Sequence, residues 1–132
     1  MQPSQHQVGF LGAGKMGEAI LASLIRSECC QPRDLLACEA VDARRTQIRQ
    51  RYRGKVTACP QDLAATCGTI VLAVKPQDLD AALQQLAPSL SRRHLPISIA
   101  AGKTLARLQE RAGPQVRIVR VMPNLAVAVG EG

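Results

Sequence analysis

Residues 9–20 read GFLGAGKMGEAI, in which a short apolar run leads into three glycines spaced G-x-G-x-x-G and an apolar helical pattern follows. The glycines are Gly12, Gly14 and Gly17. In a strand–loop–helix unit the first glycine permits a tight turn, the second lets a phosphate approach the backbone, and the third lets the helix pack closely on the strand. The free N–H groups at the start of such a helix attract anions. The stretch therefore predicts a strand, a loop that holds the pyrophosphate of a dinucleotide, and a helix.

An acidic residue at the right distance strengthens this prediction. Glu39 follows Gly17 by 22 residues and lies at the predicted end of the second strand, where a carboxylate accepts hydrogen bonds from the adenosine ribose hydroxyls. The cofactor is therefore NADP or NAD, with a lean to NAD because a 2′-phosphate would meet a like charge. Arg44 and Arg45 follow closely and could instead turn toward such a phosphate. Lys15 is expected to point to solvent, because no G-K-[ST] sequence of a P-loop follows.

Strand and helix patterns alternate along the whole chain of 132 residues. The predicted strands are 7–11, 35–39, 56–58, 69–74, 96–100 and 116–121, with a highly charged second helix at about 42–51. Such alternation indicates a single α/β domain over 1–132, a doubly wound parallel sheet of the Rossmann type with strand order 3-2-1-4-5-6. The short third strand suits an edge position.

Three further segments end at the same predicted edge of the sheet as the glycine loop. They read AVKP at 73–76, AAG at 100–102 and MPN at 122–124. Each alone could be an ordinary strand-exit turn, but together they place small or kinked loops where the nicotinamide half of a dinucleotide would lie.

Charge and cysteine content narrow the class of protein. The net charge is +7, and the positive residues are densest from Arg44 to Lys55. This group is interpreted first as a solvated helical face. The alternatives, in order, are that one or two of its arginines bind a nucleotide phosphate and that the group forms a nucleic-acid surface. Only 2% of residues are aromatic, which does not suit base stacking. Five cysteines without a C-x-x-C pair predict neither metal nor disulfides, and no apolar stretch reaches 18 residues. We expect a cytoplasmic protein with no nucleic-acid or membrane partner.

Four stretches make the sequence resemble the N-terminal half of pyrroline-5-carboxylate reductases: FLGAGKMGEAI, VLAVKPQDL, SIAAGKTLARL and RVMPNLAVAVGEG. The resemblance implies an NAD(P)H-dependent enzyme that delivers hydride to the C=N carbon of 1-pyrroline-5-carboxylate and forms L-proline. The family usually reads M-P-N-T-P, whereas this chain has Leu125 and Ala126 after Asn124. The catalytic residues are not predicted, and both histidines, His6 and His94, are interpreted as surface residues.

The cofactor-binding residues expected from the motifs and the resemblance together share one edge of the sheet. They are Leu11, Gly12, Ala13, Gly14, Lys15, Met16, Gly17, Glu39, Ala73, Val74, Lys75, Pro76, Ala100, Ala101, Gly102 and Asn124.

Family members continue into a helical domain that dimerises and completes the substrate pocket, so the resemblance implies that this chain is the cofactor domain of a homo-oligomer. Residues 123–132 are expected to begin that connection. The alternatives are another NAD(P)-dependent reductase of similar fold and a nucleotide-binding regulatory module without turnover.

Overall fold

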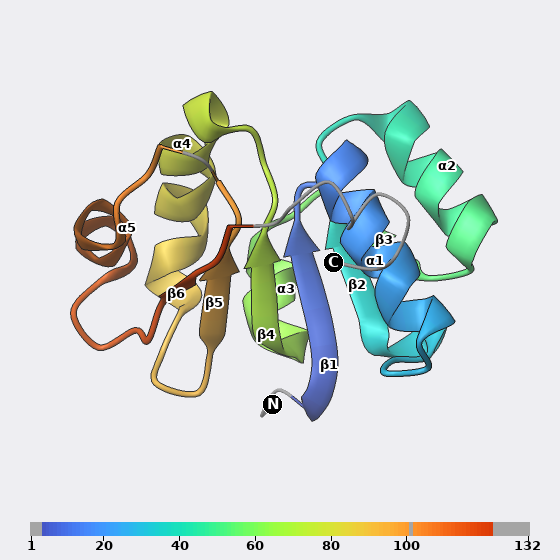
Figure 1. Ribbon diagram of the computed structural model, residues 1–132, viewed down its shortest axis with the longest axis horizontal. Helices are drawn as coiled ribbons and strands as arrows, with labels where there is room; N and C mark the ends of the chain where they lie inside the picture. Colours follow the sequence, from blue (N-terminus) through green and yellow to red (C-terminus); the bar gives the residue numbers. More distant parts are fainter. Residues whose placement is uncertain (1–3, 101, 123–132) are drawn as a thin grey trace.

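The computed structural model describes residues 4–100 and 102–122, and they form a six-stranded sheet in the order β3-β2-β1-β4-β5-β6 (Figure 1). All five neighbouring pairs are parallel, which confirms the predicted Rossmann-type topology. The strands are β1 (Ser4–Leu11), β2 (Leu35–Cys38), β3 (Lys55–Thr57), β4 (Cys67–Leu72), β5 (Leu95–Ser98) and β6 (Val119–Arg120).

The helices between the strands divide over the two faces of the sheet. They are α1 (Lys15–Arg26), α2 (Asp42–Tyr52), α3 (Gln61–Thr66), α4 (Pro76–Leu86) and α5 (Leu105–Ala112), with single 3₁₀ turns η1 (Pro32–Asp34) and η2 (Ala87–Ser89). Helices α1 and α2 lie beside the β1–β2–β3 half, and α4 and α5 lie beside the β4–β5–β6 half (Figure 1).

Two apolar cores hold these layers together, one on each face. Successive residues of a strand point to opposite faces, so Phe10 joins Leu21 of α1 and Ile48 of α2 in one core, whereas Leu11 joins Leu63 and Leu79 in the other. Both faces are covered, which explains why the strands read as continuous apolar runs rather than as alternating patterns.

The structure corrects boundaries of all six strands: β2, β4 and β5 end one or two residues before the predicted ends, and β3 is shifted by one residue. Strand β1 begins at Ser4 and β4 at Cys67, both earlier than predicted. Strand β6 covers only Val119–Arg120 instead of 116–121. The cause lies in α5, where the Gln109 Nε2 donates to the carbonyls of Gly113 and Val116 at 2.6 and 2.7 Å, so this backbone bonds to a side chain instead of β5.

The expectation that His94 is a surface residue is wrong. It is buried before β5, where its Nδ1 accepts a hydrogen bond from the Ser91 backbone N–H at 2.9 Å. The Nε2 therefore carries the proton and lies 2.8 Å from the Ala64 carbonyl oxygen. His94 thus links the turn before β5 to α3, far from the carboxyl ends of the strands.

Candidate functional site

The candidate site lies where the strand order reverses, at the carboxyl ends of β1, β2 and β4. Backbone hydrogen bonds continue past the strands there, since Gly12 N–H donates to the Cys38 carbonyl and Ala73 N–H to the Leu11 carbonyl, both at 2.8 Å. In open parallel sheets ligands bind at this reversal point, because the loops leaving neighbouring strands diverge to opposite faces.

The three glycines of the loop have different surroundings that match their predicted roles. Gly12 has a φ of +97°, and a Cβ added to it would lie 2.8 Å from the Val74 side chain. A Cβ on Gly17 would lie 2.9 Å from the Gly12 carbonyl oxygen, so α1 packs directly on the turn. A Cβ on Gly14 would meet no atom of the described residues within 4 Å. The space above Gly14 is open, as a cradle for a phosphate requires.

The start of α1 directs N–H groups toward that open space, and none of them has a hydrogen-bond partner among residues 4–100 and 102–122. Gly14 is the N-cap of α1 and has no side chain to accept hydrogen bonds from the first turn, while its own carbonyl accepts the Glu18 N–H at 2.8 Å. The first N–H groups of a helix have no partner within the helix, and they carry part of its positive dipole. An anion at this end would receive both hydrogen bonds and a favourable field.

Two cavities meet at the loop. The larger, of about 1050 Å³, lies between the start of α1 and the exits of β4 and β5; it is lined by Gly14, Lys15, Met16, Glu18, Arg44, Ala73, Val74, Lys75, Pro76, Ile99, Ala100 and Met122. The smaller, of about 480 Å³, lies toward β2; its lining includes Leu11, Gly12, Ala13, Gly14, Cys38, Glu39, Ala40, Val41, Ala73, Val74 and Lys75. The two share Gly14 and residues 73–75, so together they could hold an elongated ligand bent over the loop.

Glu39 lies in the smaller cavity, directly after β2. Its Oε1 accepts the Ala13 N–H at 3.2 Å and its Oε2 accepts the Val41 N–H at 3.0 Å. A carboxylate has about four acceptor sites, so each oxygen retains capacity for a ligand hydroxyl. The apolar Val41 beside it is 58% exposed, which supplies a surface for a flat ring.

The arginines of α2 are more strongly engaged than a solvated face would be. Arg44 donates through Nε to the Ala13 carbonyl at 2.7 Å and through Nη2 to Glu18 Oε1 at 2.5 Å. Arg45 donates through Nη1 to the Glu39 carbonyl at 2.6 Å and pairs with Asp42 at 3.1 Å. The first interpretation of this group, as a solvated face, is therefore wrong for these two residues.

Most of the residues predicted from the sequence line these cavities. Gly17 lies beneath the loop, and Gly102, with a φ of +78°, lies outside both linings. Ala101 and Asn124 lie outside the described residues. The sequence prediction missed Glu18, and it considered Arg44 only as a possible phosphate ligand, because their pairing depends on how α1 packs against α2. It also missed Val41, an exposed apolar residue next to a predicted loop, and it included Met122 only as part of the segment 122–124.

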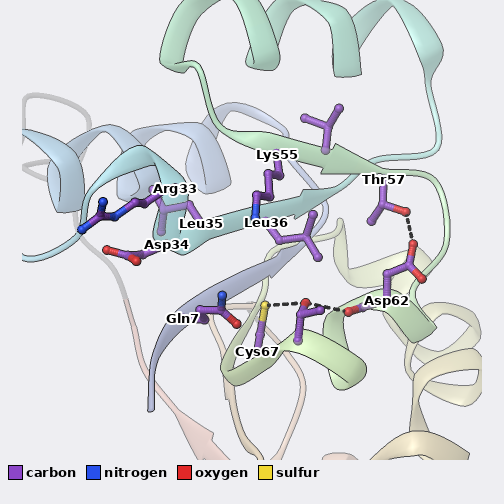
Figure 2. Close-up of a pocket in the computed structure, with 11 residues that line it drawn as sticks. Gln7, Arg33, Asp34, Leu35, Leu36, Lys55, Thr57, Asp62 and Cys67 are labelled. Carbon is purple, nitrogen blue, oxygen red and sulfur yellow. Dashed lines mark hydrogen bonds between the residues drawn. The ribbon is translucent and has the colours of Figure 1, made fainter. Parts of the chain in front are cut away.

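A third cavity, of about 420 Å³, lies at the opposite edge of the sheet, at the amino ends of β1, β2 and β4 (Figure 2). Both of its carboxylates are engaged: the Thr57 hydroxyl donates to Asp62 at 2.5 Å, and Asp34 accepts the N–H of Gln31, which lies outside the lining, at 3.1 Å. Burial raises the pKa of the Cys67 thiol at its floor, so no thiolate is available there. Gln7, Arg33 and Lys55 also line this cavity, which lies away from the glycine loop and the carboxyl ends of β1 and β4.

Within residues 4–100 and 102–122, no three His, Cys, Asp or Glu side chains are grouped so as to hold a metal ion. No helix in this part of the chain has the length and apolar character needed to cross a bilayer.

Comparison with known proteins agrees with this geometry. The family model described as NADP oxidoreductase, coenzyme F420-dependent, matches residues 7–102. The chain is 36% identical over 126 residues to pyrroline-5-carboxylate reductase 3 of Rattus norvegicus and 40% identical over 126 residues to the pyrroline-5-carboxylate reductase of Synechocystis. In both cases the match covers 96% of this chain but only 46% of the relative.

Solved structures give the same picture. The Plasmodium falciparum pyrroline carboxylate reductase with NADP bound superposes with a TM-score of 0.83 at 29% identity, over 98% of this chain and 47% of that one. The pyrroline-5-carboxylate reductase of Coxiella burnetii superposes with a TM-score of 0.87 at 26% identity, over 96% and 47%. The chain therefore spans about half the length of the relatives that it matches.

Proposed function

The chain belongs to the family described as NADP oxidoreductase, coenzyme F420-dependent, and from that premise we propose that it is the dinucleotide-binding part of a pyrroline-5-carboxylate reductase. The reaction is the NAD(P)H-dependent reduction of 1-pyrroline-5-carboxylate to L-proline. Relatives of that name match 96% of the chain, which supports this reaction over that of another reductase with the same fold.

The observation that carries the cofactor assignment is the open cradle at Gly14. The N–H groups at the start of α1 would hold the pyrophosphate, and the two cavities on either side would take the adenosine and nicotinamide halves. Val74, Lys75 and Ala100 would line the nicotinamide side, and Ala101, Gly102 and Asn124 are proposed near it. When bound, the cofactor would supply the hydride. This chain would bind and orient the cofactor and shield part of it from water.

The preference between NAD and NADP is proposed from the residues that line the smaller cavity. Glu39 lines this cavity, where it would accept hydrogen bonds from the ribose hydroxyls and its charge would oppose a 2′-phosphate. The family description and the Plasmodium falciparum structure both name NADP, and against that background we propose that this chain binds NADH at least as well as NADPH.

The rest of the pocket is proposed to come from elsewhere. The relatives extend beyond the region that this chain matches. We propose that a further helical domain completes the substrate site and makes the whole protein a homo-oligomer, that residues 123–132 begin the connection to it, and that the enzyme is cytoplasmic.

Two measurements test the proposal. Titration of the chain with NADH and NADPH, followed by nicotinamide fluorescence, tests the dinucleotide site directly. A chimera in which this chain replaces the matching part of the Synechocystis reductase tests the reaction, with the same chimera carrying Gly14→Val as its control. NADPH or NADH oxidation that depends on pyrroline-5-carboxylate supports the assignment. Cofactor binding without such oxidation in the chimera would favour a regulatory module instead.

A further inference from the structure

Glu18 is held by three donors from α2. Its Oε1 accepts Arg44 Nη2 at 2.5 Å, and its Oε2 accepts the Tyr52 hydroxyl at 2.6 Å together with Arg51 Nη1. Its side chain is only 14% exposed, although it lies in the first turn of α1 beside the larger cavity. Burial acts to raise the pKa of Glu18, but the hydrogen bonds from Tyr52, Arg51 and Arg44 outweigh burial and lower the pKa overall. The carboxylate is therefore charged and fully engaged at neutral pH.

The position of Arg44 gives this network its significance. Arg44 is the third residue of α2 and lines the larger cavity together with Gly14. Its Nε donates to the carbonyl of Ala13, the residue whose N–H donates to Glu39. The guanidinium and the ribose-side carboxylate thus hold opposite sides of one residue of the loop. If the adenosine ribose lies beside Glu39, a change of rotamer could turn the Arg44 guanidinium toward a 2′-phosphate.

Each of the three side-chain nitrogens of Arg44 nonetheless already donates one hydrogen bond within the protein, which fixes the guanidinium in place. Nε donates to the Ala13 carbonyl, Nη2 donates to Glu18 Oε1, and Nη1 donates to Gln47 Oε1 at 3.1 Å. Arg45, the neighbouring cation, is bound to the Glu39 and Ala40 carbonyls and to Asp42. Recognition of a 2′-phosphate needs a cation that is free to form charge-assisted hydrogen bonds.

We propose that Glu18 is a specificity-determining residue for the dinucleotide. It holds Arg44 against the glycine loop, which keeps the guanidinium away from the ribose and favours NADH over NADPH. The inference rests on the proposed dinucleotide site and adds a residue of α1 to the control of cofactor choice, in addition to the carboxylate after β2.

The test compares the NADH and NADPH dissociation constants of the 132-residue chain and its variants by nicotinamide fluorescence, with a thermal melt for each variant. Glu18→Gln keeps the shape of the side chain and removes its charge, and Glu18→Ala removes both. Tyr52→Phe is the matched control, because it removes one hydrogen bond to Glu18 but leaves the pair with Arg44. The double variant Glu18→Ala/Arg44→Ala tests whether Arg44 is the residue released.

The expected result is a shift of the affinity ratio toward NADPH by about tenfold or more in both single Glu18 variants, since one charge-assisted hydrogen bond is worth at least that factor. The ratio stays unchanged in Tyr52→Phe, and the shift disappears in the double variant. An equal weakening of both cofactors in the Glu18 variants would overturn the inference while leaving the dinucleotide site intact. Failure of the unaltered chain to bind either cofactor would instead overturn the proposed function, and this inference with it.

Arg44→Gln gives an independent result if the Glu18 variants do not fold. Both cofactors are expected to weaken together, because the hold on the Ala13 carbonyl is lost. A selective loss of NADPH affinity in Arg44→Gln would mean that Arg44 already contacts the 2′-phosphate, which overturns the inference.

Discussion

Replacement of Gly14 by valine is expected to abolish dinucleotide binding and leave the fold intact. The backbone at Gly14 has φ −74° and ψ −165°, an extended conformation that valine adopts readily. The added Cβ meets no atom within 4 Å among residues 4–100 and 102–122, so no clash with this part of the chain opposes it. The side chain would instead fill the open space over the start of α1.

Opposing effects on stability nearly cancel in this variant. Loss of glycine stabilises the fold by about 0.4–1 kcal/mol through the unfolded chain. A residue that caps the helix less well than glycine costs a similar amount, on the order of 0.5–1 kcal/mol. The free energy of unfolding should therefore stay within about 1 kcal/mol of the unaltered chain, a change in Tm of roughly 2–8 °C at most.

The free energy of cofactor binding is reduced far more than the free energy of unfolding. If the valine methyls separate the pyrophosphate from two N–H groups of the first turn, two charge-assisted hydrogen bonds of about 1.5–3 kcal/mol each are lost. The dissociation constant then rises at least about a hundredfold.

Gly12→Val is the matched comparison, because it changes the same loop but has the opposite consequence. At a φ of +97° and with Val74 2.8 Å from the new Cβ, valine is both strained and crowded. Strain of about 1–3 kcal/mol and overpacking of a similar size should lower the Tm by more than about 5 °C. Fluorescence titration and thermal melts of both variants provide the assay. If Gly14→Val folds and binds NADH or NADPH as tightly as the unaltered chain, the pyrophosphate does not lie over Gly14.

Three further predictions concern cofactor choice, turnover and pH. Glu39→Ser should shift the NADPH-to-NADH affinity ratio by about tenfold toward NADPH, since it removes a carboxylate that accepts hydrogen bonds from the ribose and repels a phosphate; an unchanged ratio in the same titration would show that Glu39 does not face the ribose. The 132-residue chain alone should bind cofactor but not oxidise NADPH or NADH when pyrroline-5-carboxylate is added, because half of the length of its relatives lies outside the matched region and orientation supplies much of the rate; steady oxidation measured at 340 nm would contradict this. The pKa of Glu18 is lowered in the folded chain, so its contribution to stability is present above the ordinary value of 4.5 and is lost as the pH falls through the folded pKa. The difference in unfolding free energy between the unaltered chain and Glu18→Gln, measured by urea denaturation, should therefore shrink from pH 7 to pH 3. A constant difference would count against the hydrogen-bond network assigned to Glu18.

Sequence pattern was sufficient for the order of the sheet and for the loop at its centre. Glycine spacing predicts the loop because each glycine there answers a local backbone or packing requirement, as the contacts at Gly12 and Gly17 show. Strand boundaries were less accurate, since β6 begins late because of side-chain hydrogen bonds from Gln109 that no periodicity reveals.

Contacts between distant helices were beyond the sequence. Glu18 and Arg44 are 26 residues apart, and each has an ordinary interpretation as an exposed helical charge. Only the packing of α1 against α2 turns them into a partly buried pair. His94 was misjudged for the same reason, because its partner Ala64 lies 30 residues away in α3.

The pairing of β1 with β4, which joins the two halves of the sheet, has a thermodynamic consequence. Gly12, Gly14 and Glu39 come from the half that begins with β1, whereas Val74 and Ala100 come from the half that begins with β4. A ligand that touches both walls binds only when the halves are assembled, so its binding free energy is added to that of folding. At a hundred times its dissociation constant such a ligand stabilises the native state by about 2.7 kcal/mol. The resistance of this chain to heat and proteolysis would then follow the concentration of the dinucleotide around it.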